Sequence, residues 1–418
     1  MSQNKVKFKT KNIPRLRFSE FVGAWEEKRL GELSRIYDGT HQTPNYVKEG
    51  IPFYSVEHVT ANDFSTTKHV SNEVFEKENK KVRLERNDIL MTRIGDIGTA
   101  RLIDWDVQAS YYVSLALIKH SEKINSHFLS QYINSVGFQK ELWKRTIHVA
   151  FPKKINLGEI SECKLSVSSL PEQQKISTFL GAVDDWIGNL RLQKKNLEVY
   201  KKGMMQKIFL QEVRFKDDKG KEFAKWEEKK LGAVGKIYNG LSGKTGEDFG
   251  QGDPYIAYKQ IFDSSKIDVS KFALVEIKKD EKQNRAQFGD IFFTTSSETP
   301  HEVGFASVLL NKDVDPYLNS FSFGLRANSL KELDPYFARF LFRSSIYRKQ
   351  VIKLAQGSTR YNISKVEFSK IKLLFPFFPE QQKIAEFLTS LNSLIESKQQ
   401  QITQAETWKK GLMQGLFV

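Results

Sequence analysis

The chain has 418 residues, 39% of them hydrophobic, so it is long enough for two or three domains with packed cores, and general disorder is excluded. Its one cysteine, Cys163, excludes an intramolecular disulfide and is expected to be a small, buried apolar residue in a reducing compartment. No apolar region follows the basic N-terminus MSQNKVKFKTK and no run is long enough to span a membrane, so we expect a cytoplasmic protein without a secretory signal.

The charge balance is strongly basic. Lysine and arginine exceed aspartate and glutamate by 65 − 50 = 15. Such an excess favours a polyanionic partner, because each cation placed on a phosphate releases a condensed counterion. Nucleic acid is the favoured partner class, with an anionic membrane or an acidic protein as rivals.

Two phrases occur twice, in the same order. WEEKRLGELSRIYDG at 25–39 returns as WEEKKLGAVGKIYNG at 226–240, and LPEQQKISTFL at 170–180 returns as FPEQQKIAEFL at 378–388. Between them, NDILMTR at 87–93 weakly matches GDIFFTT at 289–295. Offsets of 201 and 208 residues indicate a tandem duplication of about half the chain, which means two whole domains and not a solenoid of short repeats.

The first three quarters of each half alternate short apolar runs with turn residues. Examples are IPFYSV from Ile51, YYVSLALI from Tyr111 and DIFFTT from Asp290, which predict strands with short helices between them. The last quarter lacks further proline after Pro171 or Pro379 and has a helical period. Each proline stands just inside a predicted helix start, where its missing N–H does no harm, and each helix of about 40 residues would span roughly 60 Å.

Three-four spacing in both helices predicts a coiled coil, with interspersed lysines that help to fix its register. An antiparallel pair is preferred, because duplicated halves relate most easily by a pseudo-twofold axis, which would place the two strand-rich domains at opposite ends of a stiff spacer. The alternative is that each helix lies on its own domain as an ordinary amphipathic element. The predicted seam residues are Ile176, Leu180, Val183, Ile187, Leu190, Leu197, Ile384, Leu388, Leu391, Ile395 and Ile402.

Two basic domains held a fixed distance apart suit two half-sites on duplex DNA. The chain resembles, over nearly its whole length, the DNA specificity subunit of type I restriction–modification systems. The resemblance is carried by the paired PEQQKI and WEEK phrases, by DGTHQTPNYVKEGIPFYSVEHV from Asp38, by NDILMTRIGDIGTARLI from Asn87 and by GSTRYNIS from Gly357. In the second half SSETPHEVGFA replaces the tidier RIGDIGTA, which weakens residue-level carry-over there.

The resemblance implies an α+β chain with two strand-rich target-recognition domains and two conserved helical regions. The expected boundaries are 14–168 for the first target-recognition domain, 169–212 for the central helical region, 213–376 for the second domain and 377–418 for the C-terminal helical region. It also implies a non-catalytic subunit that binds double-stranded DNA at an asymmetric bipartite site and docks two methyltransferase subunits. Restriction and translocase subunits can join them, and S-adenosylmethionine, ATP and Mg²⁺ are implied for those partners, with no cofactor bound by this chain.

The sequence contains only incomplete motifs for phosphate binding, methyl transfer, nuclease activity or metal binding. GKT at 243–245 lacks the earlier glycine of a phosphate-binding loop, because Tyr238 stands in its place. GDPY and VDPY lack the second proline of an adenine methyltransferase turn. Asp268, followed by Glu276 and Lys278 in an acid-x-Lys pattern, is weak support for a nuclease, because this pattern is common in a chain so rich in charge. Scattered histidines and a single cysteine predict no metal site. A second function class stays open: a basic assembly scaffold that docks protein partners without reading sequence.

Base reading requires arginine, lysine, asparagine, glutamine, serine or threonine on exposed loops, and phosphate contacts only set position. The GSTRYN segment offers charge, stacking and a bidentate amide together, so it is the favoured contact. The first-half candidates are Thr40, His41, Gln42, Thr43, Arg93, Tyr111, Tyr112, Thr146, His148, Lys153 and Lys154. The second-half candidates are Ser242, Lys244, Thr245, Tyr258, Lys259, Gln260, Thr295, Ser296, Ser297, Ser358, Thr359, Arg360, Tyr361 and Asn362.

Overall fold

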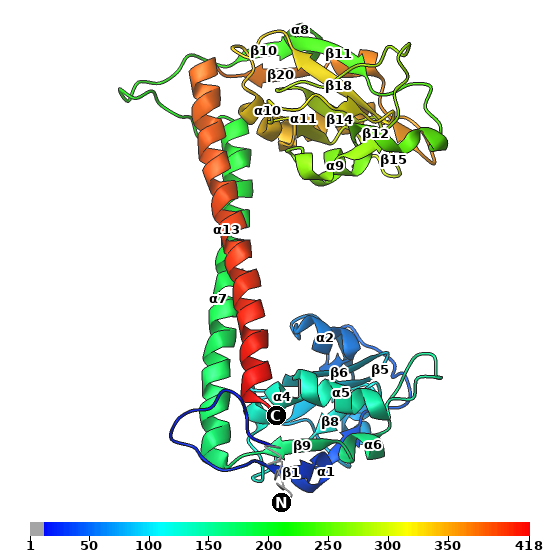
Figure 1. Ribbon diagram of the computed structural model, residues 1–418, viewed down its shortest axis with the longest axis vertical. Coiled ribbons are helices and arrows are strands. Elements are labelled where there is room, and N and C mark those ends of the chain that lie inside the picture. Colours follow the sequence, from blue (N-terminus) through cyan, green and yellow to red (C-terminus); the bar gives the residue numbers. More distant parts are fainter. Residues whose placement is uncertain (1–11) are drawn as a thin grey trace, which may run out of the picture. The chain divides into compact units, whose positions relative to one another are not determined.

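The computed structural model describes residues 12–418, so the basic N-terminal segment considered above lies outside the described residues. The chain divides into two compact units, one up to Arg191 together with Gln400–Val418, the other Leu192–Gln399. Each unit holds one strand-rich domain and one half of each of two long helices, α7 (Leu170–Phe209) and α13 (Phe378–Leu416), which Figure 1 labels.

In the first unit, a four-stranded antiparallel sheet has the order β2 (Ile36–Asp38), β8 (Leu115–Ile118), β5 (Ile89–Ile94), β6 (Asp96–Leu102). A three-stranded sheet has the order β4 (Lys68–Val70), β3 (Ile51–Tyr54), β7 (Ser110–Tyr111), and β1 (Glu26–Arg29) pairs with β9 (Lys164–Val167). The short helices are α1 (Leu30–Leu33), α2 (Val56–Ala61), α3 (Asn72–Glu78), α4 (Ser126–Ile133), α5 (Val136–Arg145) and α6 (Leu157–Ser161).

The second unit repeats this pattern. Its four-stranded antiparallel sheet has the order β11 (Gly235–Asn239), β18 (Ser322–Ala327), β14 (Ile291–Thr294), β16 (Ala306–Val308), and its three-stranded sheet the order β13 (Ala273–Val275), β12 (Phe249–Ile256), β17 (Tyr317–Leu318). β10 (Glu227–Lys230) pairs with β20 (Lys372–Phe375), and β15 (Ser296–Ser297) with β19 (Tyr361–Asn362). The helices are α8 (Leu231–Val234), α9 (Tyr258–Asp263), α10 (Pro335–Leu341), α11 (Ser345–Val351) and α12 (Lys365–Ser369), with 3-10 turns η1 (Gly246–Asp248), η2 (Val269–Lys271) and η3 (Ile352–Leu354).

The four-stranded sheets form because their central strands are apolar on both faces. In β5, Ile89 and Met91 join one hydrophobic cluster, while Leu90 between them joins another. In β14, Ile291 and Phe293 likewise separate from Phe292. Since successive side chains of a strand point to opposite faces, each sheet lies between two cores. The predicted strand-rich domains and their duplication are confirmed.

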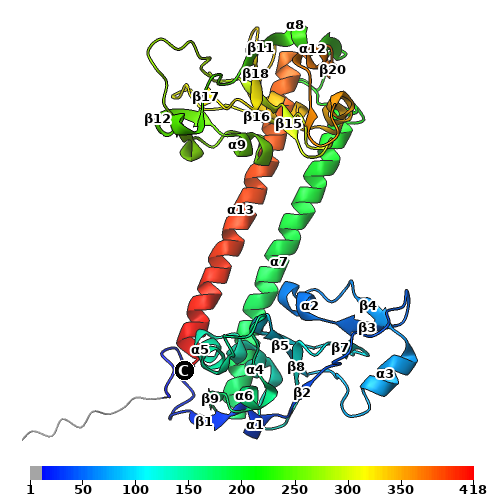
Figure 2. The same ribbon diagram turned by 90° about the vertical axis from the view of Figure 1, so that its right-hand side faces the viewer.

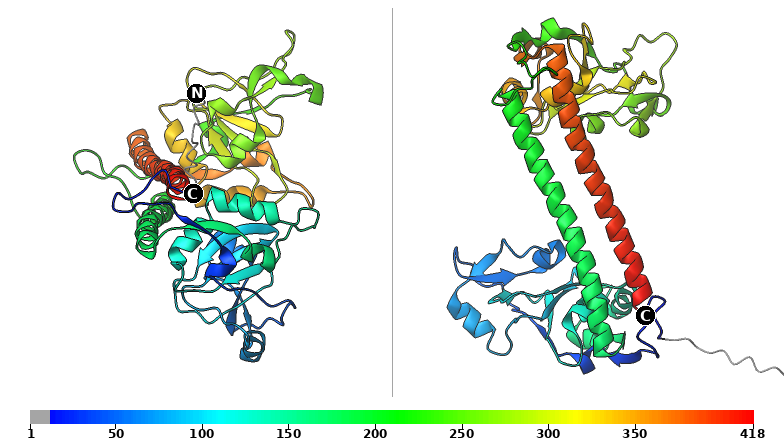
Figure 3. Two further views of the ribbon diagram at one scale, coloured as in Figure 1. Left: turned by 60° about the horizontal axis from the view of Figure 1, so that its bottom comes forward. Right: turned by 90° about the vertical axis from the view of Figure 1, so that its left-hand side faces the viewer.

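Both predicted long helices are observed and each is unbroken (Figure 2), and Pro171 and Pro379 are the second residues of α7 and α13, just inside the helix starts as predicted. In the first unit they pack antiparallel, because Asp184 pairs with Lys409 at 2.6 Å while the later residue Arg191 pairs with the earlier Glu406. The C-terminal end of α13 reaches the first domain (Figure 3), and Phe417, the residue after the helix, packs edge-on against Phe128 of the domain core. The α+β class with paired long helices is thus observed in the parts that the structure describes.

Nine of the eleven predicted seam residues fall into two groups. Near the helix starts, apolar side chains pack into the neighbouring domain, as Ile176 and Leu180 do in the first unit. In the second unit Ile384, Leu388 and Leu391 do the same. Further along, the helices pack on each other: Val183, Ile187, Leu190, Ile402 and Ala405 form one cluster. Leu197 and Ile395 are half-buried. The helices are therefore part domain core and part coiled coil, a combination of the two arrangements that the sequence left open.

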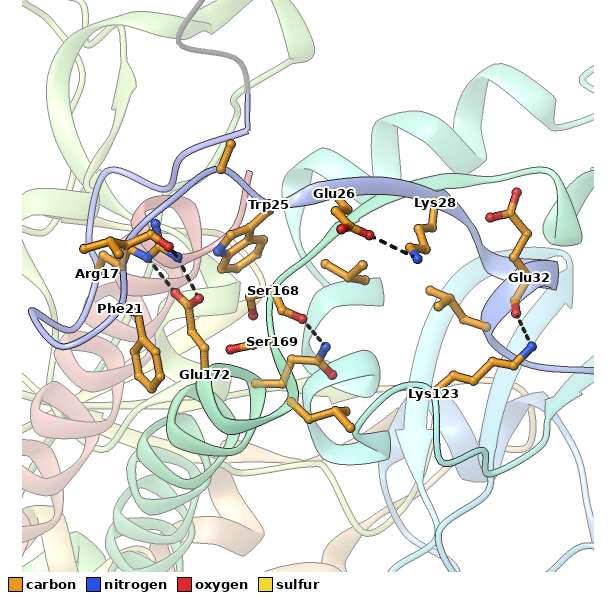
Figure 4. A pocket seen from close by; sticks show the side chains of 16 residues that line it. Arg17, Phe21, Trp25, Glu26, Lys28, Glu32, Lys123, Ser168, Ser169 and Glu172 are labelled. Carbon is orange, nitrogen blue, oxygen red and sulfur yellow. Dashed lines mark hydrogen bonds and ion pairs between the residues drawn. The ribbon is translucent and has the colours of Figure 1, made fainter.

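The repeated PEQQ phrase forms the joint between helix and domain. In the first unit, Arg17 donates to both carboxylate oxygens of buried Glu172 at 2.8 Å, and Figure 4 shows this pair beside Trp25. In the second unit, Arg214 donates to buried Glu380 at 3.3 and 2.8 Å. These pairs hold the segment before each WEEK phrase on the first turn of the following long helix.

The next residue of the phrase fixes the domain's own helix. Gln173 accepts a hydrogen bond from the backbone N–H of Asn125, the N-cap residue of α4, at 2.9 Å. Gln381 accepts the same bond from the N–H of Asp334, the N-cap of α10, also at 2.9 Å. Two identical residues thus carry the same two anchoring contacts in each unit.

Candidate nucleic-acid interface

A loop at residues 147–154 joins α5 to α6 and stands out from the first domain (Figure 1). Its stem is closed by the N–H of Ile147 donating to the carbonyl of Lys154 at 2.8 Å. The N–H of Gly95, which follows β5, donates to the carbonyl of Lys153 at 2.8 Å, and the N–H of Ile155 donates to the carbonyl of Arg93 at 3.0 Å. The loop is therefore pinned to the end of the central strand.

The loop at residues 356–362 has the same frame in the second domain. The N–H of Gln356 donates to the carbonyl of Asn362 at 2.9 Å, and the N–H of Ile363 to the carbonyl of Thr295 at 3.1 Å. Gly357 has φ of 132°, and a Cβ there would lie 2.1 Å from the carbonyl oxygen of Arg360, so only glycine fits this bend. The frame is shared, whereas the tips HVAFPK and GSTRY differ completely.

The tip of the 147–154 loop carries cations beside an aromatic ring. Lys153 lies 4.7 Å above the ring of Trp143, and the ring of His148 lies 4.3 Å from the same indole. Trp143, Lys153 and Lys154 are all exposed. Three predicted residues, His148, Lys153 and Lys154, therefore lie on one loop, and two of them, His148 and Lys153, lie against Trp143 of α5.

A second group in the first domain surrounds the turn after β2. His41, Gln42 and Thr43 are exposed, and the Thr43 hydroxyl lies 3.5 Å from that of half-buried Tyr112. His41 Nε2 lies 2.6 Å from the carboxylate of Asp38. Thr40 is buried, with its backbone paired to that of Tyr111. Its exposed members can face a ligand, while Thr40 holds the turn on the sheet.

Three other first-domain candidates are structural. Arg93 is 7% exposed and donates to the carbonyls of Val113 and Ile155 at 2.8 and 3.3 Å, and burial lowers the pKa of its guanidinium. Tyr111 is buried, which raises its pKa, and its hydroxyl donates to the carbonyl of Asp38. Buried Thr146 donates to the carbonyl of Leu142. These side chains hold the turn after β2 and the 147–154 loop in place, and they do not face solvent.

In the second domain, a cavity of about 460 Å³ gathers predicted residues from three segments. Tyr258 lies beside Phe262 with near-parallel rings, and its hydroxyl donates to the carbonyl of Ser296 at 2.6 Å. The buried Ser296 hydroxyl has no partner among the described residues. The predicted residues that line this cavity are Tyr258, Lys259, Ser296, Ser297 and Arg360.

The remaining second-domain candidates divide by exposure. Ser242, Ser358, Thr359 and Asn362 are exposed, Tyr361 and Thr295 are half-buried, and Gln260 donates to the carbonyl of Lys271 outside the cavity. Lys244 has a side chain only 3% exposed and is paired with Glu281 at 2.6 Å. Thr245 caps the η1 turn through Asp248. The GKT segment is thus an internally bonded turn.

Sequence reasoning missed the apolar side chains of this surface. Phe262 and Phe321 line the cavity, and Val149 and Phe151 are exposed on the first loop. The signal was present, since aromatic residues stand inside polar loop segments, but apolar residues are usually assigned to a core.

A separate apolar patch lies on the helices. In the first unit, Trp186 of α7 and Trp408 of α13 are each 48% exposed, with ring centroids 6.3 Å apart, and Phe179 packs edge-on against Trp408. The corresponding residues in the second unit, 208 positions away, are Leu394, Tyr200 and Phe387. Exposed aromatic residues on a helix pair are typical of protein interfaces.

Within residues 12–418, no cluster of three or more histidine, cysteine, aspartate or glutamate side chains is arranged to hold a metal ion. In the same residues, no helix is both long and apolar enough to cross a membrane. Cys163 is buried, and burial raises the pKa of its thiol to about 12.

Two repeated strand-rich domains and two long helices are thus the framework that carries the exposed polar loops. The sequence model of the type I restriction modification DNA specificity domain matches residues 23–199 and again 224–407. The chain therefore belongs to the type I restriction modification DNA specificity family, as its resemblance predicted, and DNA recognition is the role of that family.

Relatives and solved structures agree. Two specificity subunits of Methanocaldococcus jannaschii, the MjaVIII type I enzyme subunit and the putative MjaX one, are each 25% identical, covering 97% of this chain and 95% and 96% of their own. The type I S subunit from M. genitalium superposes with a TM-score of 0.56 at 15% identity, covering 97% of this chain and 99% of that one. A chain from a study of complex assembly in the type I system gives 0.60 at 15% identity, covering 94% and 97%. Both solved structures share this fold over at least 94% of the chain.

Proposed function

We propose that this chain is the specificity subunit of a type I restriction–modification complex in which each strand-rich domain reads one half of an asymmetric bipartite DNA site. The observation that carries the proposal is the pair of loops at 147–154 and 356–362. Their stems make matching backbone hydrogen bonds to the strand ends at Arg93 and Thr295. Two domains that recognise different half-sites need loops held in the same way on each domain, with different residues at their tips.

The chemistry of the second domain supports base reading. Arg360 and Asn362 are exposed on the 356–362 loop. Arginine can form two hydrogen bonds to the edge of a guanine, and asparagine can form two to the edge of an adenine. The adjoining cavity adds aromatic walls and hydroxyls. The formal charge of +15 supplies the sequence-independent attraction to phosphates.

The long helices have two roles in this proposal. They set the gap between the two half-sites, and they dock two methyltransferase subunits, one on each apolar patch. Trp186 and Trp408 would anchor one subunit, and Leu394 and Tyr200 the other. This chain would act without catalysis of its own, while its partner subunits, including those for translocation and restriction, bind S-adenosylmethionine, ATP and Mg²⁺.

Methylation mapping of a host with and without this gene tests the proposal. We expect a methylated two-part motif with a fixed gap that is present only with the gene. The scaffold alternative predicts no sequence motif, and purified chain would then bind random and genomic duplexes equally, with a steep loss of binding at high salt. Methylation or cleavage by the chain alone, supplied with S-adenosylmethionine, Mg²⁺ and ATP, would instead identify a stand-alone enzyme.

A further inference from the structure

The tip of the 147–154 loop exposes two apolar side chains almost completely. Val149 and Phe151 show 97% and 104% of their reference areas to solvent. Among the described residues, no other large hydrophobic side chain reaches these values, and Val22 follows at 87%. Water around an aromatic ring is unfavourable, so a ring held outward in this way gains when a partner covers it.

The loop is built to present these side chains. The backbone bonds of Lys153 to Gly95 and of Lys154 to Ile147 close the stem directly below the tip. The stem is further tied to buried Arg93, whose guanidinium bonds the carbonyl of Ile155. These bonds fix both ends of the tip, and in this arrangement the Phe151 ring is held away from the domain core.

The surroundings of the tip identify the kind of partner. Lys153, Lys154 and His148 flank the ring, and residues 146–154 contain no acidic side chain. Lys153 is held in place over the Trp143 ring at 4.7 Å. An apolar ring flanked by cations is complementary to duplex DNA. The phosphates attract the flanking lysines, and the ring can enter between two adjacent base pairs.

The second domain lacks this device. Its tip, Gly357 to Tyr361, contains no aliphatic side chain, its aromatic residue Tyr361 is half-buried, and the rings of Phe262 and Phe321 line a cavity. A wedge at one half-site and a polar reader at the other make the two domains unequal in how they read DNA, not only in what they read.

We infer that Phe151 is a wedge that enters between adjacent base pairs of the first half-site and unstacks them, with Val149 beside it and Lys153 and Lys154 on the flanking phosphates. The inference rests on the proposed reading of DNA by this domain. Unstacking is cheapest at pyrimidine–purine steps. Phe151 therefore acts as a specificity residue, and the first half-site should carry a flexible TA or CA/TG step where the ring enters.

The test uses the full chain and duplexes that carry the methylated motif, with 2-aminopurine placed in turn at each step of each half-site. Binding of the unaltered chain should raise the fluorescence at one step of the first half-site only. Phe151→Ala should abolish that rise, weaken binding by roughly 5- to 150-fold, as expected for loss of one base–aromatic stack, and remove the preference for a flexible step. Phe151→Leu, which keeps an apolar wedge, should retain part of the signal.

Two matched variants serve as controls. Val22→Ala removes another highly exposed apolar side chain of the same unit and should leave binding unchanged. Arg360→Ala should weaken binding without altering the signal at the first half-site. Because Phe151 makes no buried contact, its replacement leaves the fold intact, which a thermal melt checks.

The outcomes separate the two proposals. Sequence-specific binding without any fluorescence rise, or an equal rise with Phe151→Ala, would overturn the wedge and leave the proposed function standing. Phe151→Ala with normal DNA signals but lost association with methyltransferase subunits would assign the tip to a protein partner, which also overturns it. Absence of sequence-specific binding by the unaltered chain would reject the proposed function and the wedge with it.

Discussion

The carboxylate of Glu380 accepts a hydrogen bond from the indole Nε1 of Trp226 at 3.0 Å. In the first unit the corresponding residues are Glu172 and Trp25, but the buried Nε1 of Trp25 has no partner among the described residues. Both carboxylates bind an arginine, Arg214 and Arg17. The repeated PEQQ phrase thus serves the same joint twice, and the second joint has one more hydrogen bond.

Replacing the second carboxylate should destabilise its unit more than the same change in the first. Glu380→Ala leaves Arg214 beside a buried vacancy and Trp226 without its acceptor, so we expect a loss of about 3–5 kcal/mol in the free energy of unfolding. Glu172→Ala should cost about 1 kcal/mol less, the worth of one hydrogen bond. Denaturant titration measures both. As a control, Glu228→Ala removes an exposed ion pair with Lys372 and should change the free energy of unfolding by about 1 kcal/mol or less. Equal losses for Glu380→Ala and Glu172→Ala would refute the contribution of the Trp226–Glu380 hydrogen bond.

A lysine stands at equivalent positions of the two long helices, and among the described residues it forms an ion pair in the first unit but not in the second. Lys409 binds Asp184, whereas Lys201 lines a groove with Asn392 at the corresponding place. Burial, together with the positive Arg339, lowers the pKa of Lys201, although Glu198 and Glu396 oppose the shift. The unfolded chain therefore binds more protons than the folded one between the lowered pKa and the usual 10.5, and stability rises with pH across that window.

Because burial of the Lys201 charge destabilises the fold, Lys201→Met should raise the melting temperature at pH 7, by about 2–4 °C for each kcal/mol gained in the free energy of unfolding. This gain should shrink as the pH approaches 10.5. Asn392→Asp should also stabilise, because it restores the ion pair of the other unit. Melting curves at a series of pH values measure both, with exposed Lys202→Met as the control. A gain that does not change with pH would show that charge burial is not the cause.

Arg360→Ala should weaken recognition of the second half-site alone. The residue stands on the 356–362 loop at the edge of the cavity, and loss of a paired contact to a base costs about 1–3 kcal/mol. Competition binding with duplexes altered in one half-site at a time measures this. Lys331→Ala, an exposed cation outside the loop, is the matched control. Equal loss at both half-sites would rule out Arg360 as a base-reading residue.

Trp186→Ala should reduce the number of bound methyltransferase subunits from two to one. An exposed tryptophan that anchors an interface contributes about 2 kcal/mol or more, and the second unit carries its own patch at Tyr200 and Leu394. Sedimentation of the assembled complex counts the subunits, and DNA binding by the chain alone should be unchanged. Retention of two subunits would place the docking surface elsewhere.

Much of the architecture could be predicted from the sequence, because the duplication and the helical period are explicit in it. The sequence could not predict which seam residues pack into a domain and which pack between the helices. Ile176 and Ile187 belong to the same three-four pattern, yet Ile176 lies in the domain core and Ile187 lies between the helices. Arg93 and Lys244 were expected at the surface as charged residues, yet carbonyls and a carboxylate hold them inside. Phe151 was overlooked for the opposite reason, because apolar residues are expected in a core.

The division of labour between helices and domains is the central claim, and a matched deletion tests it most directly. Removing residues 191–197 and 399–405 takes one heptad from each long helix and keeps the helical phase. Seven residues rise about 10 Å in a helix, close to three base pairs at 3.4 Å each. Methylation mapping should then show the same two half-motifs separated by a gap about three base pairs shorter. An unchanged gap, or a change in either half-motif, would contradict the account.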